Sequence, residues 1–208
     1  MRNILIFCIS VMLFALPLLS HADSFEKQAS YTVCFTPGQD CTSEIVGVIN
    51  NAINNVWVQA YSFTSRPIAQ ALVLAKERGV HVQIIFDKDA LIGKRGTLRY
   101  FTRHQIPVWI DNAPAIAHNK VMIVDETQVI TGSFNFTRAA QQQNAENVLI
   151  IYDAGLAKKY LANWQSRQHV AEFYKSRVYS TSAETADQTN WLNKFWQWLV
   201  KWFKQLNL

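Results

Sequence analysis

Cysteine is scarce in this chain: only three of its 208 residues are cysteine, at positions 8, 34 and 41. Cys34 and Cys41 have no histidine and no second cysteine pair near them in sequence, so their spacing does not favour a zinc site. The six residues between them are rich in turn formers that can fold the chain back. The pair therefore predicts a disulfide between the first strand and the following helix, and no metal or cofactor is expected.

Charge is nearly absent from residues 1–22, which contain Arg2 and no acidic residue. An apolar run follows Arg2, and Ser20-His21-Ala22 has the small-x-small pattern of a cleavage site. This pattern predicts a signal peptide over residues 1–22, cleaved after Ala22, and a periplasmic or secreted protein. An uncleaved membrane anchor is the alternative, because the run is about as long as a short membrane span.

The chain has a modest excess of basic residues. Its formal charge of +5 falls to +4 if Arg2 leaves with the signal peptide, which is compatible with a polyanionic partner such as nucleic acid. Several basic residues follow the predicted strand 80–86: Lys88, Lys94, Arg95, Arg99 and Arg103. They are candidate contacts for that partner, and a solvated helix face is the alternative interpretation.

Strand and helix patterns alternate along the chain. Apolar and β-branched runs predict strands over residues 31–35, 56–61, 81–86, 108–110 and 148–152, and helices over 43–54, 67–78, 96–104, 137–142 and 154–173. Pro67 suits a first helical position, and Gly79 suits a helix end. The order predicts an α/β fold in one domain over residues 23–177, with a mixed β-sheet flanked by helices on both faces.

One of the five histidines opens a dense polar pattern, H-x-K-x4-D-x6-G-S-x-N, which runs from His118 to Asn135. Two apolar runs flank a polar turn inside the pattern, which predicts a tight β-hairpin. Side chains two apart leave the same face of a strand. We therefore expect the hairpin to bring together His118, Lys120, Ser133 and Asn135. A lysine charge with hydroxyl and amide hydrogen bonds can stabilise phosphoryl oxygens, and an imidazole can attack phosphorus.

The pattern resembles the signature of the phospholipase D superfamily, and the chain is similar to the small bacterial periplasmic endonucleases of the Nuc type within it. The segments Cys34-Phe-Thr-Pro-Gly and Val58-Gln-Ala-Tyr-Ser-Phe-Thr64 extend the resemblance over residues 30–174. The resemblance implies a metal-independent reaction in which His118 attacks phosphorus, or serves as the acid partner. Water then hydrolyses the phosphohistidine intermediate.

Two carboxylates complete the set of candidate catalytic residues. Glu146 occupies the place where the family keeps a carboxylate that hydrogen-bonds the far nitrogen of the catalytic imidazole and fixes its tautomer. The alternative is an exposed glutamate at a strand start. Asp125 belongs to the motif, but its position in the hairpin turn favours a structural role, because aspartate stabilises turns through local backbone hydrogen bonds.

The motif occurs once, and no second H-x-K is present. The reaction needs one histidine to attack and another to protonate the leaving oxygen. A chain with one copy must take the second histidine from another subunit. We therefore expect a two-fold homodimer with both motifs at an isologous interface.

The composition changes beyond Arg177. Residues 178–190 are polar and predict a linker. Residues 191–208 combine several tryptophans with three lysines on one narrow helical arc, which predicts an amphipathic helix suited to a membrane interface. Packing of this helix on its own dimer or in a partner groove is the alternative.

Together these patterns predict an exported phosphodiesterase that acts on nucleic acid, as an endonuclease with little sequence preference. Hydrolysis of phospholipid headgroups is one alternative, since the same chemistry cleaves both substrates. A non-catalytic protein that binds nucleic acid or lipid through an inherited site is the other. A non-catalytic protein is disfavoured because all five expected catalytic residues are present: His118, Lys120, Ser133, Asn135 and Glu146.

Overall fold

The computed structural model describes residues 22–92 and 96–175. Most of the predicted signal peptide, the linker 178–190 and the amphipathic helix 191–208 lie outside the described residues, as do Lys94 and Arg95.

The described residues form an eight-stranded mixed sheet in the order β1-β7-β6-β5-β2-β3-β4-β8. The strands are β1 (Ser30–Thr36), β2 (Asn55–Ala60), β3 (His81–Asp87), β4 (Val108–Asp111), β5 (Lys120–Val124), β6 (Gln128–Gly132), β7 (Glu146–Tyr152) and β8 (Glu172–Phe173). The helices are α1 (Cys41–Asn50), α2 (Arg66–Glu77), α3 (Gly96–Arg103), α4 (Arg138–Gln142) and α5 (Ala154–Val170), with a 3-10 turn, η1 (Lys88–Leu91), after β3. The predicted α/β fold is confirmed.

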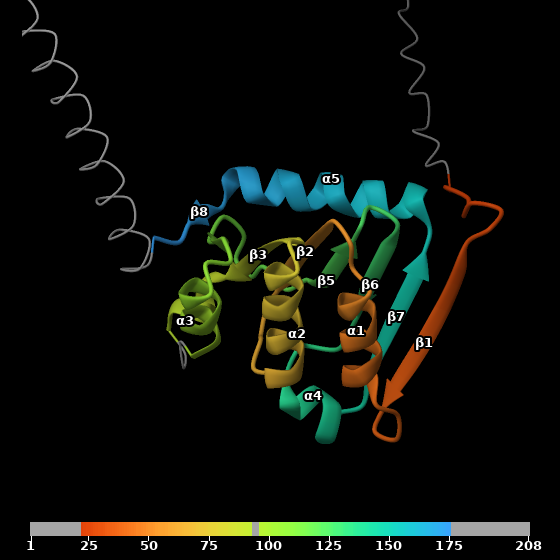
Figure 1. Ribbon diagram of the computed structural model, residues 1–208, viewed down its shortest axis with the longest axis horizontal. Helices are drawn as coiled ribbons and strands as arrows, with labels where there is room; N and C mark the ends of the chain where they lie inside the picture. Colours follow the sequence, from red (N-terminus) through yellow and green to blue (C-terminus); the bar gives the residue numbers. More distant parts are fainter. Residues whose placement is uncertain (1–21, 93–95, 176–208) are drawn as a thin grey trace, which may run out of the picture.

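Helices cover both faces of the sheet, as predicted (Figure 1). Helix α5 crosses one face and packs on a small apolar cluster that includes Ile123 of β5 and Trp164. The indole nitrogen of Trp164 donates a hydrogen bond to the carbonyl of Val58 at 2.9 Å, which ties α5 to the middle of the sheet. Helices α1 and α2 pack on the opposite face over the larger core. Strand β5 is buried along its whole length because it is covered on both sides.

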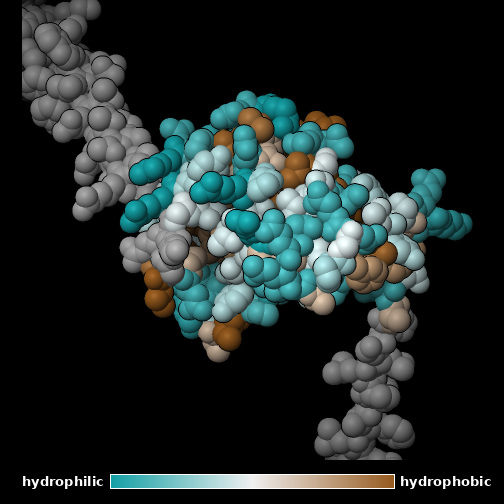
Figure 2. Space-filling model, turned by 90° about the horizontal axis from the view of Figure 1, so that it is seen from below, coloured by the Kyte–Doolittle hydropathy of each residue, from teal (hydrophilic) through white to brown (hydrophobic). Residues whose placement is uncertain are grey.

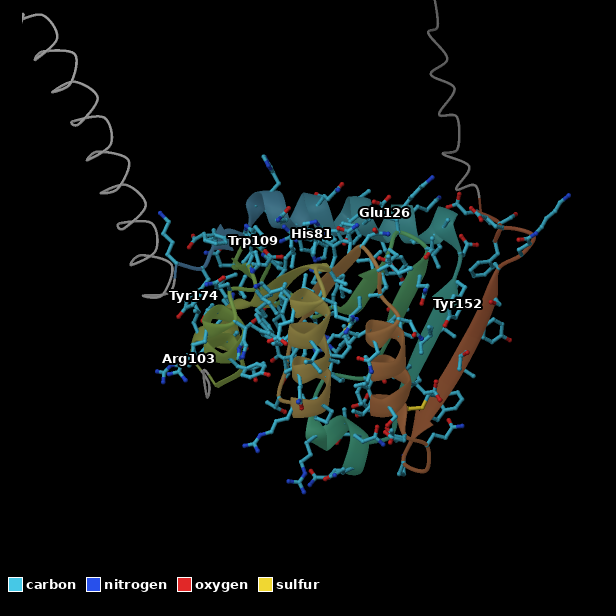
Figure 3. All side chains as sticks on the ribbon, viewed as in Figure 1. His81, Arg103, Trp109, Glu126, Tyr152 and Tyr174 are labelled. Atoms are coloured by element: carbon cyan, nitrogen blue, oxygen red, sulfur yellow. A yellow bond between two sulfur atoms is a disulfide. The ribbon has the colours of Figure 1, made fainter. Side chains whose placement is uncertain are left out.

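The predicted hairpin is present as β5 and β6, which pair antiparallel with Met122 opposite Ile130. Strand β5 also pairs with β2, so that Lys120 lies opposite Ala60. The hairpin turn and the lysine therefore lie at opposite ends of the sheet. Figure 3 labels Glu126, in the turn, near α5, and Figure 1 shows α4 at the other end.

Two helix ends differ from the prediction. The helix predicted over 43–54 ends at Asn50, because the following backbone turns and its N–H groups bind the Asp125 carboxylate. The helix predicted over 154–173 ends at Val170, and the next residues form β8 instead, which pairs with β4. In both places a contact with a segment distant in sequence overrides the local helical pattern.

The predicted disulfide between Cys34 and Cys41 is confirmed. It joins β1 to the first residue of α1, and both cysteines are buried. Asp40, the N-cap of α1, accepts a hydrogen bond from the Ser43 amide at 3.0 Å, so the helix start is held by a cap as well as by the cross-link.

Removing this cross-link is expected to lower the free energy of unfolding by about 2–3 kcal/mol, because a short closed loop no longer restricts the unfolded chain. Urea unfolding of the Cys34→Ala/Cys41→Ala variant, followed by circular dichroism, measures the change. Dithiothreitol should destabilise the native protein by a similar amount and leave the variant unaffected. Equal stability of the oxidised native protein and the variant would contradict the prediction.

Candidate active site

The motif residues other than Asp125 lie at the end of the sheet near α4, where β2 ends and β5 begins. His118 lies in the loop just before β5, and Lys120 is the first residue of that strand. The Tyr61 amide, directly after β2, donates to the carbonyl of Asn119 at 3.1 Å. This backbone contact holds the loop after β2 against the loop before β5. Upstream, the buried carboxylate of Asp87 accepts from the amide of Ala117 at 2.6 Å and so holds the residue before His118.

His118 and Lys120 are in direct contact. The ammonium nitrogen of Lys120 lies 2.9 Å from Nδ1 of His118 and donates to the His118 carbonyl at 2.6 Å. Lys120 is only 7% exposed, and burial lowers the pKa of its ammonium, while the charge of Glu146 acts in the opposite direction. Lys120 meets the ring at Nδ1, so Nε2 is the ring nitrogen that does not contact the lysine. Attack on phosphorus by Nε2 requires the tautomer with the proton on Nδ1, and therefore requires that the ammonium leave this contact.

Tyr61 is part of the site, although the sequence assigned it no role. Its ring lies 4.6 Å from the His118 ring, centroid to centroid, and 5.3 Å from the Lys120 ammonium. The tyrosine hydroxyl reaches the Asp89 carboxylate at 3.4 Å. An aromatic ring in this position restricts the imidazole and stabilises the neighbouring cation. In the sequence, the feature that points to Tyr61 is its position at the end of the predicted strand 56–61.

Ser133 and Glu146 form the second half of the cluster. The Ser133 hydroxyl donates to Glu146 at 2.6 Å and accepts from the Asn147 amide at 3.1 Å. The other oxygen of Glu146 accepts from Asn144 at 2.9 Å. The structure thus places Glu146 against Ser133, and not in the expected hydrogen bond with His118. The negative charge of Glu146 acts to raise the pKa of the Lys120 ammonium, against the larger effect of burial.

Gly132 allows this arrangement. Its φ of +143° is one that other residues rarely adopt, and an added Cβ would lie 2.3 Å from the carbonyl oxygen of Asn147. Strands β6 and β7 can therefore approach closely just before Ser133. The glycine of the motif is explained by this close approach.

Asn135 carries an unpaired polar atom. Its side-chain oxygen is buried and has no hydrogen-bond partner among the described residues. An unpaired buried oxygen costs about 1–3 kcal/mol, so a ligand that supplies a donor there recovers free energy. The adjacent Phe136 carbonyl accepts from the amides of Thr64 and Ser65, both at 2.9 Å, which anchors this loop to the one after β2.

Asp125 lies away from the other motif residues, at the far end of β5. Its carboxylate accepts hydrogen bonds from the amides of Ile53, Asn54 and Asn55 at 2.7–2.8 Å. Its own φ of +51° is that of a tight hairpin turn. The structure therefore gives Asp125 the structural role that its position in the turn favoured.

The other candidates are dispersed. Lys88 lies in η1, and Arg99 and Arg103 lie on α3, where Figure 3 shows Arg103 on the outer side. Two further histidines were not candidates. His81 is near α5, at the opposite end of the sheet from α4. His104, directly after α3, bonds the carbonyl of Tyr100 in that helix at 2.8 Å.

The described residues contain neither a metal-binding cluster nor a membrane-spanning helix. No cluster of three or more histidine, cysteine, aspartate or glutamate residues in this part of the chain could hold a metal ion. None of the helices in residues 22–92 and 96–175 is both long and apolar enough to cross a membrane.

Comparison with known proteins identifies the family. A family model described as "Cardiolipin synthase, PLD-like domain" matches residues 45–167, which include every candidate catalytic residue. The chain belongs to the phospholipase D superfamily. The superfamily signature recognised from His118 to Asn135 is thus confirmed, and the protein is a hydrolase of that superfamily.

Three relatives illustrate the range of the superfamily. A Rickettsia conorii protein named "Phospholipase D" is 44% identical over 159 residues, which cover 76% of this chain and 80% of that protein. The human protein named "Mitochondrial cardiolipin hydrolase" is 30% identical over 128 residues, 62% of this chain and 51% of that one. The crystal structure of Nuc from Salmonella typhimurium, a phospholipase D family member, is 37% identical, with a TM-score of 0.68 over 72% of this chain and 100% of that chain.

Proposed function

We propose that this protein is an exported, metal-independent phosphodiesterase that cleaves nucleic acid as a non-specific endonuclease. The contact between His118 and Lys120 carries the proposal, because an imidazole that can act as a nucleophile lies beside an ammonium where β5 begins. Similarity to Nuc over the whole length of that protein supports a nuclease.

In the proposed reaction, the Lys120 ammonium turns from the imidazole to the phosphoryl oxygens and neutralises them. His118, in the tautomer with its proton on Nδ1, then attacks phosphorus through the lone pair of Nε2. The bond from phosphorus to the sugar oxygen breaks, and the departing oxygen takes a proton from His118 of a second subunit. That imidazole then accepts a proton from water, the water oxygen attacks phosphorus, and the bond to His118 breaks. Atoms and protons balance, and both histidines return to their starting states.

A homodimer is part of the proposal, since the chain has one motif and the reaction uses two histidines. In each chain Glu146 accepts a hydrogen bond from Ser133 and makes none with His118. We therefore expect a carboxylate to reach and orient each imidazole only when two chains assemble. Sedimentation analysis of residues 23–208 tests this. An active, stable monomer would refute it.

Phospholipid hydrolysis is the second candidate function. It is favoured by the names of similar proteins, "Phospholipase D" and "Mitochondrial cardiolipin hydrolase". The membrane contact proposed for residues 191–208 would suit it as well, and vesicle flotation with and without residues 178–208 tests that contact. Equal flotation of the two proteins would refute membrane binding by this segment.

A substrate panel in EDTA distinguishes the two functions. The mature protein, residues 23–208, is incubated with supercoiled plasmid, labelled single-stranded DNA and RNA, cardiolipin vesicles and phosphatidylcholine vesicles. We expect cleavage of nucleic acid that persists in EDTA. Release of lipid headgroups without any cleavage of nucleic acid would favour the second function instead.

The pH dependence tests the role of Lys120. Burial lowers the pKa of its ammonium, so the free enzyme loses this charge at a lower pH than an ordinary lysine does. The kcat/KM for a diester should therefore decline on the alkaline side below the usual lysine range, since this ratio reports on the free enzyme. In Lys120→Arg the guanidinium stays charged, and the alkaline decline should move to higher pH even if the maximum rate is lower. An unchanged alkaline limb in that variant would contradict the prediction.

A further inference from the structure

We propose that a groove that carries Arg66 and Arg138, beside the candidate active site, binds the sugar-phosphate backbone of a single-stranded nucleic acid next to the scissile phosphate. This inference rests on the proposed function and assigns its substrate class. Two adjoining hollows form the groove. The first, of 660 Å³, lies between the starts of α1 and α2 and helix α4, and the second, of 540 Å³, lies between α2 and α3. Both are lined by Thr64, Ser65 and Arg66, so they meet over the start of α2.

The groove adjoins the site through the backbone. Thr64 and Ser65 donate to the Phe136 carbonyl, and Phe136 follows Asn135 directly. Beneath this contact the rings of Phe63 and Phe136 pack at a centroid distance of 5.5 Å. The groove residue Arg138 is three positions from Asn135, which is at most about 10 Å of chain. A strand held at Asn135 therefore has a short path into the groove.

The groove carries positive charge that the protein leaves available. Arg66 and Arg138 are exposed, and neither forms an ion pair with a described residue. Gln142 accepts a hydrogen bond from the Arg138 guanidinium at 2.7 Å, which holds it while other N–H groups stay free. The first turn of α2 contains no acidic residue, and the helix dipole adds to the positive potential there.

One carboxylate also lines the groove. Asp40 lies at the α1 side, and hydrogen bonds from the Ser43 side chain and amide lower its pKa, so it stays ionised. An ionised carboxylate repels phosphate, so the bound backbone should follow the side formed by Arg66 and Arg138.

The charged groups of the lining favour a nucleic acid over a lipid tail. Most lining residues are polar by type, yet carbon atoms make up the larger part of the exposed lining, above all in the second hollow. Arg66 and Arg138 can therefore bind phosphates while sugars and bases pack on the carbon surface. Figure 2, which views the molecule from below, shows hydrophilic side chains over most of this end. Tyr100 in the second hollow offers an aromatic ring on which a base can stack, and each hollow has the size of a small-ligand pocket.

Binding measurements test the groove without cleavage. A fluorescent single-stranded oligonucleotide is titrated with full-length protein carrying His118→Asn, and its Kd is measured by anisotropy at several salt concentrations. Adding Arg66→Ala and Arg138→Ala should raise the Kd about tenfold or more. It should also reduce the slope of log K against log salt by about 1.4, since each phosphate contact on a single strand contributes about 0.7. The matched control replaces two exposed lysines elsewhere, Lys27→Ala and Lys158→Ala, and removes the same charge.

The outcomes separate this inference from the proposed function. Equal Kd values and salt slopes for the arginine and lysine pairs would overturn the groove. If the protein with both arginines replaced loses binding to cardiolipin vesicles but keeps oligonucleotide binding, the groove is a lipid site and the inference is overturned. If the arginine pair weakens oligonucleotide binding but the active protein cleaves no nucleic acid, the groove is supported and the nuclease function fails.

Discussion

Replacing His118 with asparagine is expected to lower kcat for phosphodiester cleavage by at least about 10³-fold, equivalent to about 4 kcal/mol of transition-state stabilisation. Asparagine can keep a polar contact with Lys120 but has no nitrogen that can form a phosphohistidine. Acid quenching with a substrate labelled at phosphorus should trap label on the native protein and none on the variant. The Kd for an oligonucleotide should change much less than kcat. Retention of more than a tenth of the native rate would rule out His118 as the nucleophile.

The same variant measures whether two subunits share one site. If each site uses His118 from both chains, a mixed dimer is as inactive as the variant itself. After subunit exchange at equal concentrations, only about a quarter of the dimers should be active, and the activity per native chain should be halved. His81→Asn provides the control, since His81 is exposed and distant from the site. Activity that depends only on the amount of native chain would show that the sites are independent.

Replacing Arg167 with methionine is expected to lower the free energy of unfolding by about 3–5 kcal/mol. The guanidinium makes two hydrogen bonds to the Asp111 carboxylate, at 2.6 and 2.7 Å, and so ties α5 to β4. The Asp111 side chain is fully buried, whereas that of Arg167 is 28% exposed. Methionine leaves a buried carboxylate without its counter-ion, and this desolvated charge is the main cost. The loss is a large part of the 5–15 kcal/mol typical of a folded domain.

Urea unfolding followed by tryptophan fluorescence measures this loss. Lys158→Met on the same helix is the matched control, because Lys158 is exposed and its replacement should change the free energy of unfolding by less than about 0.5 kcal/mol. Adding Asp111→Asn to the Arg167→Met protein removes the buried charge and should restore part of the stability. A loss below about 1 kcal/mol in Arg167→Met would show that the ion pair contributes little.

Local patterns predicted the features that short segments determine. The β5–β6 hairpin follows from two apolar runs around a polar turn, and the link between Cys34 and Cys41 follows from their spacing across turn residues. The position of His118 beside Lys120 follows from their separation by one residue next to a strand. In each case the interacting residues are few positions apart, so the chain has little freedom to arrange them otherwise.

Contacts between distant segments were not predictable in the same way. Tyr61 reaches His118 because Ala60 pairs with Lys120, and nothing local specifies that register. Glu146 meets Ser133 because β7 lies beside β6. Helix α5 likewise ends where a distant segment takes over: the residues after it pair with the edge of β4 as strand β8. Sheet order and register therefore decide which polar groups touch in the site.

The hairpin turn at Asp125 has a consequence for insertions and deletions. It lies at the end of the sheet away from the site, yet its length sets which residues of β6 face those of β5, and hence where the chain leaves the sheet at Gly132. One extra residue in the turn would shift the pairing by one position and turn Ser133 and Asn135 to the opposite face. The spacing between the two halves of the motif is thus as strict a requirement as the identity of its residues, and natural length variation should fall in the other loops.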